Sequence, residues 1–214
     1  MKFYESGDSS KPVIFLFPGT CCLYSSFDHV LDGLHSYFYT VAVSYDGFDP
    51  NEKTEFYSME DECEKIEQEI RTKYGGRIKA AYGCSLGGSF VSLLIQRKRI
   101  HIDHGIIGSS DMDEAGNLVA KIQASMVVPF MYKMIHTGAL PKFMQKKLNK
   151  TDGAKKELYN GFLNMFGIGK GGSPWITKQS IYNQFYSDLV TKVQHGIDAV
   201  SYTHLRAHET LSDL

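Results

Sequence analysis

The sequence lacks several features that would restrict where the protein works. Its N-terminus, MKFYESGDSSK, has no apolar stretch of the kind that forms a signal peptide. No run approaches the roughly 18 consecutive apolar residues of a transmembrane helix. The four cysteines, Cys21, Cys22, Cys63 and Cys84, do not have the spacing of a metal site. We therefore expect reduced thiols, no metal, no membrane span and a cytoplasmic location.

An excess of charge of one sign is also absent. The 214 residues carry 23 Lys and Arg against 24 Asp and Glu, a formal net charge of −1. That balance gives no reason to expect a nucleic-acid or membrane-surface partner, and nothing indicates an oligomeric state. The average hides an asymmetry, since residues 121–178 contain ten lysines and only two acidic residues, Asp152 and Glu157. This basic segment is either a solvated surface or one that attracts an anionic substrate or lipid.

Apolar runs alternate with amphipathic segments over the first 110 residues. PVIFLF at 12–17 is a continuous apolar run closed by Pro18-Gly19, which is typical of a strand buried on both faces. Further strands are expected at 39–45, 77–83 and 102–110, and helices at 26–38, 58–74 and 86–98, the first two with Ser26 and Ser58 as N-caps. Because parallel strands need crossover helices, this alternation predicts an α/β fold with a mostly parallel sheet flanked by helices.

The pattern changes at about Asp111, which ends the predicted core at 1–111. Residues 112–185 indicate helices and loops, and six of the eight methionines lie there. We expect a helical cap, or lid, inserted over the C-terminal edge of the sheet, whose methionines either pack its helices or adapt to an apolar ligand. The helical pieces are expected at 127–135, 141–150 and 155–166.

The cap ends in GIGKGG at 167–172. No strand precedes this segment and the GK[ST] ending of a phosphate-binding loop is missing, so a hinge is expected there. The sequence predicts no cofactor.

One serine lies between glycines at the end of the strand predicted at 77–83. Gly83-Cys84-Ser85-Leu86-Gly87 matches G-x-S-x-G, with a predicted strand before it and a predicted helix after it. So tight a turn strains the serine backbone and exposes its hydroxyl, and side chains at Gly83 and Gly87 would collide. Gly88 lets the helix approach the sheet. We predict that Ser85 is a nucleophile; the alternative is a serine that caps the helix.

Two backbone amides are candidates for stabilising an oxyanion beside Ser85. The N–H of Leu86 lies at a helix N-terminus, where the partial positive charge favours an anion. The second donor would come from the loop after the strand at 12–17, where Thr20, or alternatively Cys21, supplies the N–H. The alternative is an ordinary strand-ending turn.

The order of the predicted elements resembles the α/β-hydrolase superfamily over residues 12 to about 190. That order is strand, PGT loop, helix, strand, helix, strand, GCSLGG elbow, helix, strand and helical cap. The chain lacks the His-Gly pair common in the oxyanion loop of that superfamily. The resemblance implies a serine hydrolase that cleaves a small-molecule carboxylic ester or related acyl bond through an acyl-enzyme on Ser85. A non-catalytic small-molecule-binding protein on the same scaffold and an acyltransferase are the alternatives.

The superfamily order of Ser, acid and His implies that the acid and the histidine follow the cap. Asp111 is a candidate acid from an earlier strand end, and Asp198 with His204 or His208 is the other possible set. His29 and His35 are expected at the surface of the first helix, and His136 lies in the cap.

Only 29 residues follow Phe185, about half of what two strands, two helices and their loops need. We therefore expect residues 186–214 to be a truncated return to the core, with the last strands missing. VSYTHLRAHETLSDL at 200–214 resembles translated adapter read-through and is expected to be a non-native tail. The chain is then expected to be nearly inactive, because the triad acid and histidine are missing.

Overall fold

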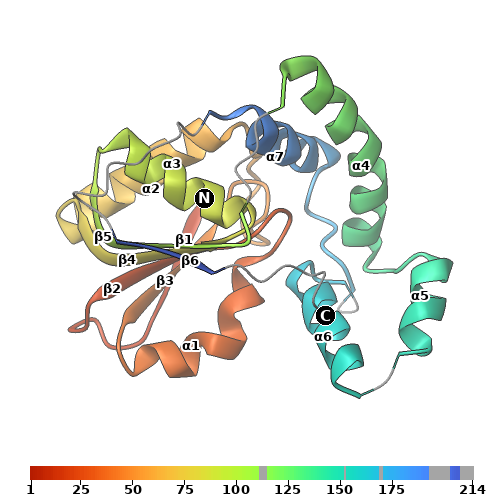
Figure 1. Ribbon diagram of the computed structural model, residues 1–214, viewed down its shortest axis with the longest axis horizontal. Helices are drawn as coiled ribbons and strands as arrows, with labels where there is room; N and C mark the ends of the chain where they lie inside the picture. Colours follow the sequence, from red (N-terminus) through yellow and green to blue (C-terminus); the bar gives the residue numbers. More distant parts are fainter. Residues whose placement is uncertain (111–114, 152, 169–170, 193–202, 208–214) are drawn as a thin grey trace.

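The computed structural model describes residues 1–110, 115–151, 153–168, 171–192 and 203–207. Within these residues the centre is a six-stranded sheet with helices on both faces (Figure 1). The strands, in the spatial order β1-β3-β2-β4-β5-β6, are β1 Lys2–Ser6, β3 Tyr39–Ser44, β2 Val13–Phe17, β4 Arg77–Cys84, β5 His101–Gly108 and β6 Thr203–Ala207. β1 runs antiparallel to β3, and every other neighbouring pair is parallel. The predicted α/β fold with a mostly parallel sheet is confirmed.

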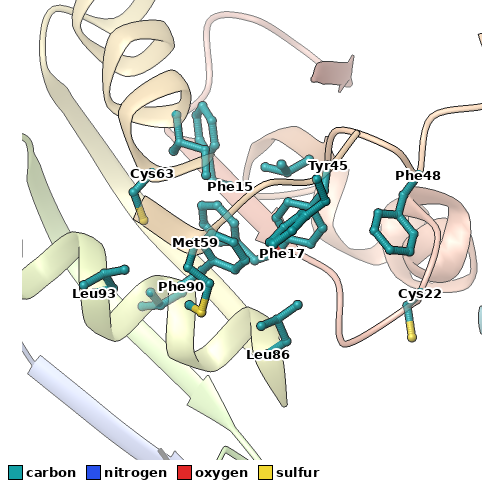
Figure 2. Packing of buried hydrophobic residues seen from close by; sticks show 14 of the residues in the cluster. Phe15, Phe17, Cys22, Tyr45, Phe48, Met59, Cys63, Leu86, Phe90 and Leu93 are labelled. Atoms are coloured by element: carbon teal, nitrogen blue, oxygen red, sulfur yellow. The ribbon is translucent and has the colours of Figure 1, made fainter. Parts of the chain in front are cut away.

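Three helices cover the sheet. α2 (Met59–Tyr74) and α3 (Leu86–Arg97) lie on one face, and α1 (Asp28–His35) lies on the other (Figure 1). The larger core lies under α2 and α3, where Figure 2 shows Phe90 of α3 beside the rings of Phe17 and Tyr45. The Tyr45 and Phe90 ring centroids are 4.7 Å apart in a stacked arrangement. This core fixes the helix that follows Ser85.

α2 forms as the sequence predicts. The Ser58 hydroxyl accepts a hydrogen bond from the amide of Asp61 at 3.1 Å, and the helix ends at Gly75 in the left-handed conformation, with φ of 63°. Its inward-facing side chains are fully buried, namely those of Met59, Cys63, Ile66 and Ile70. Capping and periodicity therefore agree with the packing.

The start of α1 differs from the prediction that Ser26 is its N-cap. Ser26 lies inside a short 3₁₀ helix, η1 (Tyr24–Phe27), and its amide donates to the carbonyl of Leu23 at 3.0 Å. α1 begins at Asp28 without a side-chain cap. The chain enters the helix through this tighter turn, which already provides acceptors for the first amides.

β6 is a second difference, since no strand was expected after residue 200. The backbone of Thr203–Ala207 pairs in parallel with β5, from His104 to Gly108. A free parallel edge offers unpaired backbone groups to any extended segment that reaches it, whatever its side-chain pattern.

Four further helices follow the first five strands. They are α4 Asn117–Thr137, α5 Lys142–Asn149, α6 Gly153–Met165 and α7 Lys178–Val190. α4 packs on α7, and α5 and α6 lie beyond the end of α4 (Figure 1). α4 ends at Gly138, and a Cβ there would overlap the backbone of Gly172, so these two backbones cross in close contact. Residues 169 and 170 of the predicted hinge lie outside the described residues.

Hydrogen bonds attach this helical segment to the loops that follow β2 and β3. The amide of Leu23 donates to the carbonyl of Met165 at 2.9 Å. The indole N–H of Trp175 donates to the carbonyl of Phe48 at 3.3 Å. These loops leave the carboxyl ends of their strands, so α4 to α7 lie at the edge of the sheet where α/β proteins place their ligands. The boundaries predicted for core and cap remain predictions.

Candidate active site

Ser85 lies in a strained turn between β4 and α3. Its φ of 54° and ψ of −125° fall in a region that non-glycine residues rarely adopt. The turn is held because the Ser85 amide donates to the carbonyl of Gly108 at 2.9 Å. Leu86 next to it is fully buried, whereas Ser85 itself is exposed. The protein therefore maintains a costly backbone conformation at a side chain that faces outward.

The three glycines around Ser85 have no room for side chains. A Cβ on Gly83 would overlap the carbonyl oxygen of Gly87, and one on Gly87 would overlap the carbonyl oxygen of Phe17. A Cβ on Gly88 would come within 2.7 Å of the Ser110 Cβ. β4, α3 and the end of β2 therefore meet at distances that only glycine allows.

The first turn of α3 brings the amide of Leu86 next to Ser85. The amides of Gly88 and Ser89 donate back to the carbonyl of Ser85, at 2.8 and 3.2 Å. Leu86 precedes them as the first helical residue, and the first N–H groups of a helix have no intrahelical acceptor. This amide is therefore the donor that the sequence predicts for an oxyanion beside Ser85, and its helix-terminal polarity suits that role.

The loop after β2 touches the turn directly. A Cβ on Gly19 would lie 3.6 Å from the Cβ of Ser85 and 3.3 Å from the carbonyl oxygen of Cys84. Two residues further on, Cys21 is left-handed with φ of 60°. Its amide donates to the buried Oε1 atom of Gln184, at 2.6 Å. Because this bond occupies the Cys21 amide, Thr20 is the better of the two predicted donors.

Gln184 was not found from the sequence. It lies on α7, fully buried, 163 residues after the amide that it binds. Its Nε2 atom is buried and has no hydrogen-bond partner among the described residues. The polar stretch KQSIYNQFYSD contains two glutamines, and nothing in it distinguishes Gln184 as the one with this role. Only the pattern of buried polar residues on α7 reveals it.

No acid or histidine of the predicted set is placed beside Ser85. Asp111, Asp198 and His208 lie outside the described residues, and of His204 only the backbone on β6 is described. Across the described ranges, no imidazole or carboxylate hydrogen-bonds to the Ser85 hydroxyl.

The histidines of α1 and α4 have other surroundings. His29 is exposed on α1, as expected. His35 is partly buried instead of lying free at the surface, because its Nε2 atom is 2.9 Å from the Ser6 hydroxyl and 3.2 Å from that of Thr40. His136, near the end of α4, lies against Tyr132 with ring centroids 5.0 Å apart. Its Nδ1 atom is buried with no partner in the described part of the chain.

Burial disfavours the thiolate form of all four cysteines. Burial raises the pKa of Cys21 and Cys63 well above the usual value, that of Cys22 to about 12, and that of Cys84 in the same direction. A thiol becomes a strong nucleophile only as a thiolate, so these values disfavour a nucleophilic cysteine. Among the described residues no group of three or more His, Cys, Asp and Glu side chains is arranged to hold a metal ion.

No family model and no curated protein matches the sequence. Solved structures match the fold. A protein from Desulfitobacterium hafniense assigned to the α/β-hydrolase family has a TM-score of 0.65 at 15% identity, over 88% of this chain and 72% of that chain.

A structure from work on carboxylesterases of Nitrososphaera gargenis has a TM-score of 0.67 at 14% identity, over 96% of this chain and 74% of that one. The enol-lactonase from Burkholderia xenovorans LB400 has a TM-score of 0.62 at 12% identity, over 90% and 71%. The chain therefore has the α/β-hydrolase fold.

Proposed function

We propose that the protein is a serine hydrolase that cleaves a carboxylic ester or related acyl bond through an acyl-enzyme on Ser85. The observation that carries this proposal is the exposed serine held in a strained turn, with φ of 54°, at the N-terminus of α3. Strain of this kind is maintained where it serves a function. Similarity to an enol-lactonase and to a structure from work on carboxylesterases supports the reaction class.

The reaction begins when the Ser85 Oγ attacks the acyl carbon and gives up its proton to a base. The carbonyl oxygen becomes an oxyanion, which the amides of Leu86 and Thr20 stabilise. The C–O bond to the leaving alcohol then breaks, the alcohol takes up a proton, and the acyl group stays on Ser85. Attack by water releases the acid and regenerates the serine.

The base in this scheme is a histidine in the family that the fold resembles, and none of the described imidazoles bonds to Ser85. Loss of the serine or histidine of such a triad lowers kcat by about 10⁶, and the oxyanion site with substrate binding retains about 10³ to 10⁴ over water. We therefore expect slow acylation of Ser85 and very slow turnover by the 214-residue chain.

A fluorophosphonate probe tests this proposal, because its phosphorus forms a bond to the serine oxygen as an acyl carbon does. Intact-mass measurement followed by peptide mapping should find one adduct, on Ser85. Ser85→Ala should abolish it, whereas the neighbouring Ser89→Ala should retain it. Adducts spread over many serines, or none after prolonged incubation, would contradict a nucleophilic Ser85.

A non-catalytic binding protein is the second candidate, because no described side chain activates Ser85. In that case ester analogues should raise the melting temperature and be recovered uncleaved, with no adduct on Ser85. An acyltransferase would instead label at Ser85 and pass the acyl group to an added alcohol or amine faster than to water. Mass spectrometry of the products separates these outcomes.

A further inference from the structure

α4 is apolar on two opposite sides. Its inner side packs on α7 through Ala120, Ala124 and Val128, each at most 1% exposed. Residues two positions apart on a helix point about 200° apart, so the side chains at 118, 122, 126 and 130 form the opposite side. There the exposed fractions are 72% for Leu118, 53% for Ile122, 74% for Met126 and 42% for Phe130.

A stripe of four large apolar side chains facing water indicates a surface that binds something. Within the described residues α4 is the one helix long and apolar enough to cross a membrane by length and composition, with 28% of that window buried. Both its ends are nevertheless tied to the protein. The amide of Ala115 donates to the carbonyl of Leu189 at 2.8 Å, and the amide of Ser173 to that of Ile135 at 2.7 Å. α4 therefore lies along the protein with one face outward.

The charges around this stripe are positive. Lys121 and Lys133 are exposed on α4, Lys142 and Lys146 are exposed on α5, and Lys150 is exposed directly after α5. α5 also exposes 69% of Phe143, and Figure 1 shows both helices at the side of the molecule away from the sheet. Glu157 is the one acidic side chain described between residues 115 and 178.

A recess in the same segment is apolar as well. A cavity of about 220 Å³ is lined by Leu140, Phe143, Met144, Leu148, Thr151, Tyr159 and Leu163, from α5, α6 and the loops beside them. The exposed Phe143 lies at its rim. Such a recess suits a flexible apolar chain.

We propose that the outer sides of α4 and α5, which we call the cap surface, bind an anionic lipid bilayer. The apolar stripe would enter the headgroup region, and the lysines would bind the lipid phosphates and carboxylates. A second cap surface is a poorer partner, because both would carry the same uncompensated positive charge. The proposal is independent of the chemistry at Ser85.

Flotation of the full chain with vesicles tests this proposal. It should float with phosphatidylcholine vesicles that contain phosphatidylserine, and far less with phosphatidylcholine alone. Raised salt should weaken the binding because it screens the lysines. Each basic residue near an anionic surface strengthens binding about fivefold, so Lys142→Glu with Lys146→Glu should weaken it about 25-fold or more. Ile122→Ser with Met126→Ser should weaken it to a similar degree.

Matched controls on the body of the molecule use residues of comparable exposure. Tyr37 and Tyr57 are 72% and 65% exposed, so Tyr37→Ser with Tyr57→Ser removes as much apolar surface away from the cap. Lys53→Glu with Lys98→Glu changes the net charge equally. These variants should bind as the unmodified chain does.

Circular dichroism establishes that every variant is folded, and the charge variants test the proposal even if a stripe variant fails to fold. The proposal is overturned if the chain ignores anionic vesicles, binds both vesicle types equally, or loses binding in the body controls. Light scattering that shows a dimer broken by the stripe variants would overturn it as well, in favour of a second copy.

Discussion

The sheet with its Ser85 turn and the cap helices obey different packing rules. Around the turn, β2, β4 and α3 approach so closely that glycine alone fits at 83 and 87. In the cap, the side of α4 that carries Ala120 and Ala124 is buried, and the opposite side exposes Ile122 and Met126. The two regions also differ in where their charged side chains lie. The body buries Glu62 completely, whereas the lysines of α5 with described side chains are exposed. A site that must hold backbone amides in place needs the first kind of packing, and a surface that meets a partner needs the second.

The largest effect should come from adding one methyl group to the turn. In Gly83→Ala the Cβ would overlap the backbone carbonyl of Gly87, which cannot move without displacing α3. We expect a loss of about 5 kcal/mol or more in the free energy of unfolding, enough to leave the chain unfolded. In the cap, a Cβ added to Gly161 on α6 would have no atom within 4 Å beyond its chain neighbours and the backbone of its own helix. Gly161→Ala should stabilise by up to about 1 kcal/mol, since alanine favours helix. Urea titrations measure both.

Burial of a charge in the body predicts a pH dependence. Burial raises the pKa of Glu62 from 4.5 to about 7, while Lys65, at 2.8 Å, opposes the rise. Because the folded value is the higher one, this group stabilises the fold at acid pH, and that contribution is lost as pH rises through 7. Relative to the unmodified chain, Glu62→Gln should gain about 2 kcal/mol of stability between pH 5 and 8. The exposed cap variant Glu157→Gln should change by less than about 0.5 kcal/mol at either pH. If the difference in stability between Glu62→Gln and the unmodified chain did not change between pH 5 and 8, the Glu62 carboxyl of the folded protein would be ionised over that whole range.

The smallest effect concerns one of the hydrogen bonds that join the two regions, the bond from the Cys21 amide to Gln184. Gln184→Leu removes the acceptor of the Cys21 amide while keeping a similar volume. We expect fluorophosphonate labelling of Ser85 to slow by about tenfold or more, because the Thr20 amide loses its fixed direction. Gln184→Glu keeps an acceptor and should label faster than Gln184→Leu. Gln179→Leu, on the exposed side of α7, should label at the unmodified rate. Equal rates for all three would show that Gln184 has only a structural role.

Elements with a regular apolar pattern could be predicted from the sequence. β2 is a run of apolar residues, and α2 combines the Ser58 cap with apolar residues at helical spacing. The glycines around Ser85 indicate the tight turn there. β1 was missed because KFYES is a short edge strand without such a run. α7 was missed because it buries polar side chains, among them Ser180, Gln184 and Ser187, that serve loops distant in the sequence. α4 begins ten residues before the expected piece at 127–135 because it is apolar on both sides.

The site could be predicted only where its geometry is local. Ser85 and Leu86 belong to one turn, so their neighbours in the sequence determine their direction. The choice between Thr20 and Cys21 depends on Gln184, and no local pattern contains that contact. The candidate acid Asp111 stays a prediction, as do the catalytic roles of Ser85 and the two amides.

Two cap helices hold the loop after β2 through hydrogen bonds to its backbone amides. Gln184 of α7 holds the amide of Cys21, and Met165 at the end of α6 holds that of Leu23. If α6 and α7 moved away from the core as one unit, this loop would lose both hydrogen bonds. The amide of Thr20 would then no longer be held in one orientation. If the proposed oxyanion role of this loop holds, α6 and α7 contribute to the site by holding the loop in place. In the proposed hydrolase, substrate would therefore have to reach Ser85 without displacement of α6 and α7 as one unit.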